Sequence, residues 1–261
     1  MAFDNDMESI EDLGRANLRL IQRKDGFRFG EDSVLLAWFV AQELSCRKRK
    51  PIHVLELGTN CGAVSVLLAG RRSDVDIVGI ERQVVAASVF QRNIEMNALG
   101  NRMHGYCLDL RELPIPEIPK ASFDAVYMNP PFSMDTRGPK TTRGDDALAA
   151  ARFEEYGTID DFIRVGASML FPDGDMFIVI RAARMADVIS SLQKASMAVM
   201  RIQNVHPYVH KDASLCLIRA RKCKKSGGFR MLPPLIIRKK DGTYTETLLN
   251  IYRSEDESCS I

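Results

Sequence analysis

Residues Asn129, Pro130, Pro131 and Phe132 directly follow an apolar run and combine groups that suit chemistry on a flat amino group. The side-chain carbonyl of Asn129 and the backbone carbonyl of Pro130 can each accept a hydrogen bond from such an amine. Proline fixes φ and has no N–H that would compete for these acceptors. The ring of Phe132 offers a face on which a flat target can stack. The alternative is a strand that simply ends in prolines, because proline stops ladder pairing.

A glycine turn and two acidic residues occupy the corresponding places after three earlier apolar runs. Gly58 and Gly62 follow the first run, and glycine lets a backbone turn tightly or be approached closely. Glu81 ends the second run, where a carboxylate can accept hydrogen bonds from both ribose hydroxyls of a nucleoside. Asp109 closes the third. Taken singly, each feature also fits an ordinary strand-to-helix turn or a surface ion pair.

Apolar strands alternate regularly with amphipathic helices, and this alternation places all four features at strand ends. The predicted strands are 18–22, 52–57, 76–81, 102–110, 123–129, 174–180, 198–205 and 214–221; the predicted helices are 31–44, 60–71, 84–99, 145–155, 159–171 and 186–195. The alternation is typical of an α/β fold with a doubly wound, mostly parallel sheet, whose ligands bind beyond the carboxyl ends of the strands. The last two strands predict an antiparallel pair at one edge, and residues 235–248 predict a C-terminal β-hairpin.

The glycine turn resembles the ExGxGxG pattern of class I S-adenosylmethionine-dependent methyltransferases, with Asn60 at the middle glycine. Asn is the non-glycine residue that best tolerates a left-handed backbone, so we expect the turn to be kept. The resemblance implies a Rossmann-like, seven-stranded fold and S-adenosyl-L-methionine as cofactor, with Asp109 accepting from its adenine amine. Residues 129–132 likewise resemble the [DNS]PP[FYW] motif of enzymes that methylate planar nitrogens, which makes all four candidate catalytic residues.

From about Leu18 to Tyr252 the chain resembles the bacterial tRNA1(Val) adenine-N(6) methyltransferase family, which modifies adenine 37 beside the anticodon. The resemblance is carried by residues 25–37, 55–63, 78–83, 128–132, 147–154, 205–222 and 235–248. It implies that the segment before the first core strand lies over the cofactor, and that the target is an unpaired base, which costs less to swing out than a paired one. The candidate cofactor-binding residues are therefore Phe29, Gly30, Asp32, Glu56, Gly58, Asn60, Gly62, Glu81, Arg82, Asp109, Leu110 and Asn129.

Basic residues are unevenly distributed, although the formal net charge is only +2. Nine Lys or Arg and no acid lie between Arg219 and Lys240, and a polar, basic loop spans residues 133–144. With the anticodon loop of a tRNA as partner, we expect both segments to hold phosphates. The candidate RNA-binding residues are Arg137, Lys140, Arg143, Arg219, Arg221, Lys222, Lys224 and Lys225. A shorter run, residues 47–50, is predicted to be a solvated loop.

Composition and length suit one large α/β domain with additions, located in the cytoplasm. The chain has 261 residues, of which 46% are hydrophobic, and six scattered cysteines typical of reduced thiols. No apolar run approaches the roughly 20 residues of a membrane span. His206 and His210 have no third ligand nearby, so no metal is expected, and no obligatory protein partner is evident. We expect an N-terminal extension and cofactor-covering helix (1–50), a methyltransferase domain (51–222), and a basic segment, hairpin and tail (223–261).

Other functions of this fold fit the sequence less well. The same motif serves guanine-N(2) rRNA methyltransferases and protein glutamine methyltransferases, but these usually carry an additional domain. Methylation of DNA adenine would call for a target-recognition domain that is not visible. A catalytically silent RNA-binding protein would not need an intact motif at residues 129–132, and a nicotinamide dehydrogenase would leave that motif unexplained.

Overall fold

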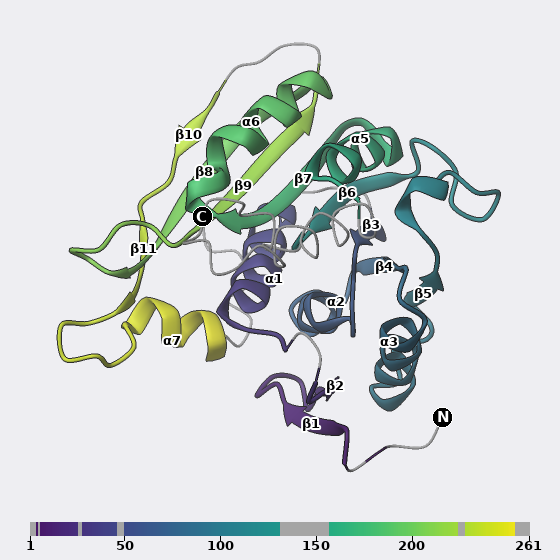
Figure 1. The fold of residues 1–261 in the computed structure, drawn as a ribbon, viewed down its shortest axis with the longest axis horizontal. Helices are drawn as coiled ribbons and strands as arrows, with labels where there is room; N and C mark the ends of the chain where they lie inside the picture. Colours follow the sequence, from purple (N-terminus) through teal and green to yellow (C-terminus); the bar gives the residue numbers. More distant parts are fainter. Residues whose placement is uncertain are drawn as a thin grey trace, which may run out of the picture.

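The computed structural model describes residue 4 and residues 6–25, 28–45, 50–130, 157–223 and 228–253. These residues form a nine-stranded sheet and a separate two-stranded ribbon near the N-terminus (Figure 1). The predicted loop 133–144, the predicted helix 145–155 and most of the basic run 47–50 lie outside the described residues.

Within the described residues, strands and helices alternate as expected through the middle of the chain. The strands are β1 (Glu8–Asp12), β2 (Arg19–Arg23), β3 (Ile52–Leu57), β4 (Val75–Glu81), β5 (Met103–Cys107), β6 (Phe123–Met128), β7 (Leu170–Arg181), β8 (Met197–Tyr208), β9 (Leu215–Lys222), β10 (Arg230–Met231) and β11 (Leu235–Arg238). The helices are α1 (Glu31–Leu44), α2 (Ala63–Ala69), α3 (Val84–Met96), α5 (Ile159–Met169), α6 (Met185–Lys194) and α7 (Glu246–Arg253), with short 3₁₀ turns η1 (Leu110–Glu112) and η2 (Ala182–Arg184).

The sheet has the strand order β10-β8-β9-β7-β6-β3-β4-β5, and β11 also pairs with β8. Strands β3 to β7 are parallel, whereas β9 lies between β7 and β8 and is antiparallel to both. The seven predicted core strands are therefore all present, and β10 and β11 extend the sheet beyond β8.

Strand direction decides which residues lie near one another at the ends of the sheet. Because β8 runs in the same direction as β7, and β11 is parallel to β8, the carboxyl ends of β3 to β8 and of β11 share one edge. We call this the carboxyl edge. The reversed strand β9 instead brings its last residues to the opposite edge.

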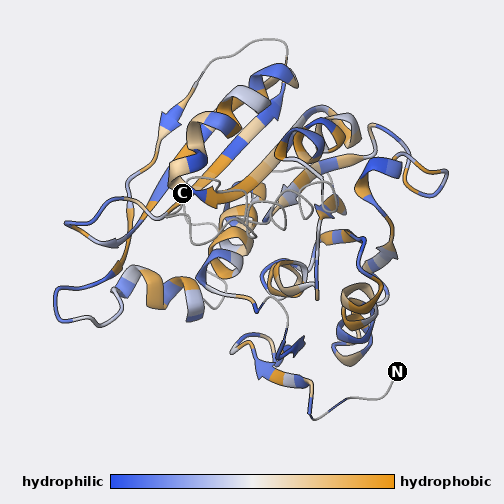
Figure 2. Ribbon diagram, viewed as in Figure 1, coloured by the Kyte–Doolittle hydropathy of each residue, from blue (hydrophilic) through white to orange (hydrophobic). Residues whose placement is uncertain are grey.

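Two hydrophobic cores fill the two faces of the sheet. Helices α1, α2, α3 and α7 pack against one face, and α5 and α6 against the other (Figures 1 and 2). Strand β6 shows the alternation of a strand buried on both sides: Ala125 and Tyr127 enter the first core, while Val126 and Met128 enter the second. The strand that leads to Asn129 is thus fixed by packing on both faces.

The N-terminal ribbon is attached to α3 by an asparagine, which also contacts the glycine turn. Asn93, which is fully buried, accepts a hydrogen bond from the Ile21 amide at 2.7 Å and donates to the carbonyls of Ile21 at 2.9 Å and Cys61 at 2.8 Å. The amide of Asn93 thus bonds backbone groups on the edge of β2 that faces away from β1, where another strand could otherwise pair. Strand β1 was not among the predicted strands; it lies in the segment expected to be an N-terminal extension.

The predicted C-terminal β-hairpin is confirmed only in part. The chain turns at Gly242, which has φ +86°, and Tyr244 forms an antiparallel bridge with Arg238 at the end of β11. The chain then forms α7 in place of a full second strand, and β11 pairs along its length with β8. The hydroxyl oxygen of Thr245 accepts from the Leu248 amide at 3.3 Å, as an N-cap residue does. Leu248 and Ile251 share a helical face and are buried, and this packing outweighs the β preference of the Thr-Tyr-Thr stretch.

Candidate active site

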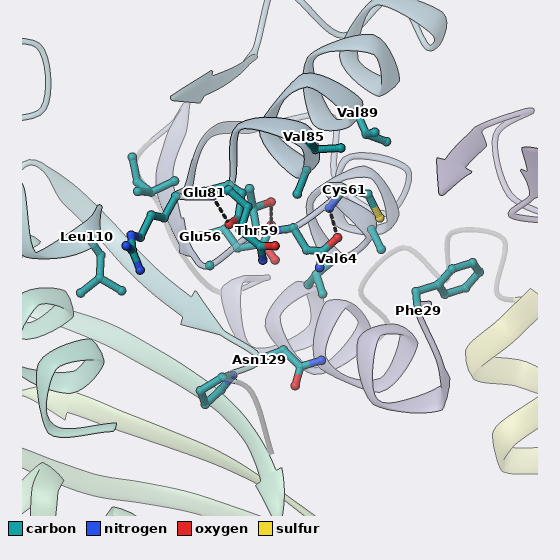
Figure 3. A pocket seen from close by; sticks show the side chains of 18 of the residues that line it. Phe29, Glu56, Thr59, Cys61, Val64, Glu81, Val85, Val89, Leu110 and Asn129 are labelled. Carbon is teal, nitrogen blue, oxygen red and sulfur yellow. Dashed lines mark hydrogen bonds between the residues drawn. The ribbon is translucent and has the colours of Figure 1, made fainter. Parts of the chain in front are cut away.

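A cavity of about 780 Å³ lies at the carboxyl edge, beyond the ends of β3, β4 and β6. Figure 3 shows acidic side chains at its centre, with Asn129 at the end of β6 on one side. Of the candidate residues, those that line the cavity are Phe29, Glu56, Gly58, Asn60, Glu81, Arg82, Asp109, Leu110, Asn129 and Pro130. The fold therefore brings together residues that are far apart in the sequence.

The glycine turn adopts the left-handed backbone that its sequence predicts. Gly58, Asn60 and Gly62 have φ values of +73°, +52° and +83°. The turn is thus kept with Asn60 in place of glycine, and its side-chain oxygen accepts from the Cys61 amide at 2.6 Å. Gly62 does not line the cavity: a Cβ there would lie 2.0 Å from the ring of Phe90, so this glycine permits helix α3 to pack closely.

The carboxylate of Glu81 is fixed at the base of the turn. Its two oxygens accept from the backbone amides of Gln83 and Asn60, each at 2.8 Å, and the residue is only 6% exposed. Burial raises the pKa of Glu81, although these amides oppose the rise. Each carboxylate oxygen can accept more than one hydrogen bond, so the group remains suited to a pair of hydroxyls.

Glu56 lies deeper and belongs to a buried hydrogen-bond network. Its carboxylate accepts from the hydroxyls of Thr59, at 2.7 Å, and Ser65, and the Ser65 hydroxyl also lies 2.7 Å from that of Tyr127. Burial raises the pKa of Glu56 to about 7. The network ties the end of β3 to α2 and β6, which stabilises the positions of the turn and of the strand before Asn129.

Asp109 lies at the far side of the cavity and caps the short turn η1. Its Oδ1 accepts from the amide of Arg111 at 2.9 Å, and the guanidinium of Arg82 lies 3.4 Å from Oδ2. Hydrogen bonding to Arg111 keeps the pKa of Asp109 below its usual value, although burial opposes the shift. The group is therefore an ionised acceptor at neutral pH, and the side chain of Leu110 lies beside it.

The amide of Asn129 has one end bound and the other free. Its Nδ2 donates to Oδ2 of Asp32 at 3.0 Å. Its Oδ1 is buried and has no hydrogen-bond partner among the residues that the structure describes. Buried polar atoms are almost always paired, so an unpaired acceptor beside a cavity marks a place for a donor. Pro130 also lines the cavity, whereas Pro131 and Phe132 lie outside the described residues.

Two residues expected to cover the cofactor have other positions. Gly30 is the N-cap of α1, and neither it nor Asp32 lines the cavity. From this segment Phe29 and Ser33 reach it instead. Sequence reasoning also missed Phe162, which lines the cavity from α5; the sequence alone carries no signal for this contact, because it depends on how α5 packs against the sheet.

Arg219, Arg221 and Lys222, which were expected to hold RNA phosphates, have other contacts in the structure. Strand β9 runs antiparallel, so these residues lead away from the carboxyl edge, with Arg221 opposite Asp175 and Lys222 opposite Met197. Arg219 is only 8% exposed, and both arginines bind Asp175. The ammonium group of Lys222 donates to the Leu170 carbonyl at 2.8 Å. The remaining candidates, Arg137, Lys140, Arg143, Lys224 and Lys225, lie outside the described residues.

A search of the described residues finds no group of three or more His, Cys, Asp or Glu side chains arranged to hold a metal ion. The helices among the described residues are all too short or too polar to cross a membrane.

Comparison with known proteins agrees with the geometry of the site. Over 235 residues, 87% of this chain and 91% of the relative, the sequence is 27% identical to the tRNA1(Val) (adenine(37)-N6)-methyltransferase of Shewanella baltica. The enzyme of the same name from Parabacteroides distasonis is 26% identical over 70% of this chain and 72% of its own length. These matches confirm the resemblance stated from the sequence.

Solved structures confirm the fold class. A predicted O-methyltransferase from Agrobacterium tumefaciens superposes with a TM-score of 0.66 at 22% identity, covering 85% of this chain and 97% of its own. The Thermus thermophilus 16S rRNA N2 G1207 methyltransferase, solved with AdoMet and guanosine, superposes with a TM-score of 0.56 at 20% identity, over 83% of this chain and 51% of its own.

The sequence profile of one family matches the chain continuously from α1 to the end of β8. This match spans residues 37–208, well over half of the chain, and contains the glycine turn, Glu81, Asp109 and the Asn129 motif. The chain belongs to the methyltransferase small domain family.

Proposed function

We propose that this protein transfers a methyl group from S-adenosyl-L-methionine to the exocyclic amine of an adenine in tRNA, at position 37 of a tRNA1(Val)-like substrate. The observation that carries the proposal is the buried Oδ1 of Asn129, which has no partner among the described residues and lies beside a cavity of about 780 Å³. A carbonyl oxygen in that position can accept a hydrogen bond from an amine whose N–H groups become stronger donors as positive charge develops on nitrogen. The names of the relatives from Shewanella and Parabacteroides support the choice of adenine 37.

The residues of the cavity fit the proposed cofactor. Glu81 presents a fixed carboxylate for ribose hydroxyls, and ionised Asp109 presents an acceptor for an adenine amine. The left-handed turn at Gly58 brings the backbone close to the bound molecule without a side chain in the way. When bound, S-adenosyl-L-methionine supplies a methyl group that is already activated as a sulfonium, so the protein needs to contribute alignment and electrostatics.

The role of Asn129 and Pro130 follows from the weakness of the nucleophile. The lone pair of an exocyclic adenine amine is delocalised into the ring. When nitrogen uses this pair to bond the methyl group, positive charge develops on nitrogen and remains until one of its protons is released to water. Two carbonyl oxygens that accept from the amine protons stabilise that charge, and they do so most effectively when their directions are fixed beforehand. The chain needs no strong base and no covalent intermediate for such a transfer.

The proposal is tested by incubating the protein with methyl-labelled S-adenosyl-L-methionine and total bacterial tRNA, and then digesting the RNA to nucleosides. We expect the label in N6-methyladenosine. Label in N2-methylguanosine, or in protein glutamine when ribosomal extracts are supplied, would replace the proposal by one of the alternative activities. The absence of label in every substrate, with RNA binding intact, would indicate a catalytically silent RNA-binding protein.

For the RNA surface we propose three exposed lysines at the carboxyl edge, in place of the residues of β9. Lys211 follows the end of β8, and Lys239 and Lys240 follow β11. Beside them, the rings of Tyr208 and His210 lie 5.7 Å apart. Three strand spacings separate β8 from β6, about 14 Å, and β11 lies one spacing further out, about 19 Å from β6. One RNA loop can span either distance. We call Lys211, Lys239 and Lys240 the carboxyl-edge lysines.

Replacing the three carboxyl-edge lysines by alanine should weaken tRNA binding and reduce its dependence on salt. The slope of log K against log salt concentration should fall by up to about 2, since each phosphate contact with single-stranded RNA contributes about 0.7. The matched control replaces Lys120, Lys194 and Arg230, which are exposed and belong to segments other than those that follow β8 and β11. Binding isotherms at several salt concentrations measure both; equal slopes for the two triple variants would place the RNA elsewhere.

A further inference from the structure

The contact between Asp32 and Asn129 determines which end of the Asn129 amide is left for a ligand. The two residues are 97 positions apart in the sequence, and Nδ2 of Asn129 lies 3.0 Å from Oδ2 of Asp32. An ionised carboxylate only accepts hydrogen bonds, so the NH₂ group of the amide must face it. The carbonyl oxygen is therefore the end that remains, buried and unpaired within the described residues.

Asp32 is itself fixed by helix α1. Its Oδ1 accepts from the Ser33 amide at 2.8 Å and lies 3.4 Å from the Ser33 hydroxyl, in the first turn of the helix. One oxygen is thus used by the helix and the other by Asn129. Because the helix packs against α2 and the sheet, the direction of this second oxygen is set by the fold.

Packing alone would not fix which of its two flip orientations the Asn129 amide adopts. The O and NH₂ groups of an amide have nearly the same size and shape, so a pocket selects between the two orientations through hydrogen bonds. In the flipped orientation the NH₂ group would meet the NH₂ group of a target base, and two donors would face each other. The flip would remove an acceptor and add an unpaired buried donor.

We infer that Asp32 is a positioning residue, which holds the Asn129 amide in the orientation that presents its carbonyl to the target amine. The inference rests on the proposed function, because it gives the free oxygen of Asn129 its use. It also explains why Asp32 lies outside the cavity lining while its partner lies in it. The acid acts on the reaction through Asn129 and needs no contact with cofactor or RNA.

The first test compares Asp32→Asn with Asp32→Ala in steady-state kinetics. Asp32→Asn keeps the shape of the side chain and its acceptor for the Ser33 amide, but it places an NH₂ group toward Asn129 and so imposes the flipped amide. We expect its kcat to fall about 100-fold, as when one aimed polar group is lost, while the KM for tRNA and the affinity for S-adenosyl-L-methionine stay close to wild type. In Asp32→Ala the side chain at position 32 imposes neither orientation on the Asn129 amide, so kcat should fall less than in Asp32→Asn. A purely structural role predicts the reverse order, since Asn retains an acceptor for the Ser33 amide and Ala does not.

The second test restores the hydrogen-bond polarity with a double variant. Asp32→Asn combined with Asn129→Asp exchanges donor and acceptor at the contact, keeps the total charge, and presents a carboxylate oxygen to the target. It should recover most of the kcat lost in Asp32→Asn. Glu31→Gln is the matched control, because it removes a charge from the same helical turn and should leave kcat unchanged.

Three results would overturn the inference. They are an unchanged kcat in Asp32→Asn, a smaller loss in Asp32→Asn than in Asp32→Ala, and no recovery in a double variant that retains wild-type cofactor affinity and melting temperature. The side-chain amide resonances of Asn129 test the contact without turnover: they should shift in Asp32→Ala and not in Glu31→Gln. If wild type itself fails to methylate adenine, the proposed function falls; if wild type is active and Asp32→Asn equally so, only the inference falls.

Discussion

Asn129→Ala should lower the rate of methyl transfer by about 100- to 1,000-fold, equivalent to about 2.7–4 kcal/mol of transition-state stabilisation. The variant removes the unpaired buried oxygen that we assign to the target amine. The backbone carbonyl of Pro130 remains, so some catalysis should persist. Glu81 and Asp109 are untouched, and the affinity for S-adenosyl-L-methionine should therefore change little. Single-turnover kinetics with saturating tRNA, together with calorimetry of cofactor binding, measure the two quantities separately.

Gln203→Ala provides a matched control for this variant. Gln203 is also a buried amide, and within the part of the chain that the structure describes its carbonyl oxygen has no partner. Its Nε2 donates to the Pro233 carbonyl at 3.0 Å, and it does not line the cavity. The Gln203→Ala variant should be less stable than wild type, with little change in the rate of methyl transfer by the folded protein. A normal rate in Asn129→Ala, or an equal loss in both variants, would remove the specific role of Asn129.

The positions of the cavity residues could be predicted because they depend on local pattern. Gly58, Glu81, Asp109 and Asn129 each follow an apolar strand, and parallel strands necessarily bring their carboxyl ends to one edge. The left-handed turn at Asn60 could be predicted for the same reason, since backbone preference is a property of the residue and its neighbours. The positions of these side chains along the sheet could therefore be predicted without knowing how the helices pack on it.

The directions of side chains could not be predicted in the same way. The contact of Asp32 with Asn129 joins a helix and a strand end that are far apart in sequence, and it depends on how α1 lies on the sheet. The basic run of β9 is a second case. Its charges suggested a surface for RNA, but the antiparallel register places Arg221 opposite Asp175, in a segment that gave no sign of needing a cation. Even helix α7 had a local signal, the N-cap residue Thr245, which the β-type residues around it concealed.

This buried cluster of β9 predicts a large effect on stability. Asp175 is fully buried and accepts, at 2.9–3.1 Å, from Nε and Nη2 of both Arg219 and Arg221. Arg219 also binds Glu43 of α1, which in turn lies 3.1 Å from the guanidinium of Arg201. The chain of charges therefore links α1 with β7, β8 and β9.

Asp175→Ala should lower the free energy of unfolding by about 3–5 kcal/mol, because it removes the buried counter-charge of Arg221 and one of the two carboxylates that bind Arg219. Urea denaturation measures the loss. Asp187→Ala, which breaks an exposed pair with Arg184, is the control and should cost no more than about 1 kcal/mol.

Burial alone would raise the pKa of Asp175, but its bonds to Arg221 and Arg219 outweigh burial and hold the pKa below its ordinary value of 3.8. The stabilisation from this carboxylate is thus present above about pH 4 and is lost as the pH falls through the lowered pKa of the folded state. The wild type and Asp175→Ala should therefore converge in stability under strongly acidic conditions, and a difference that stays constant down to the acid limit would show that lost packing, and not lost charge, destabilises the variant.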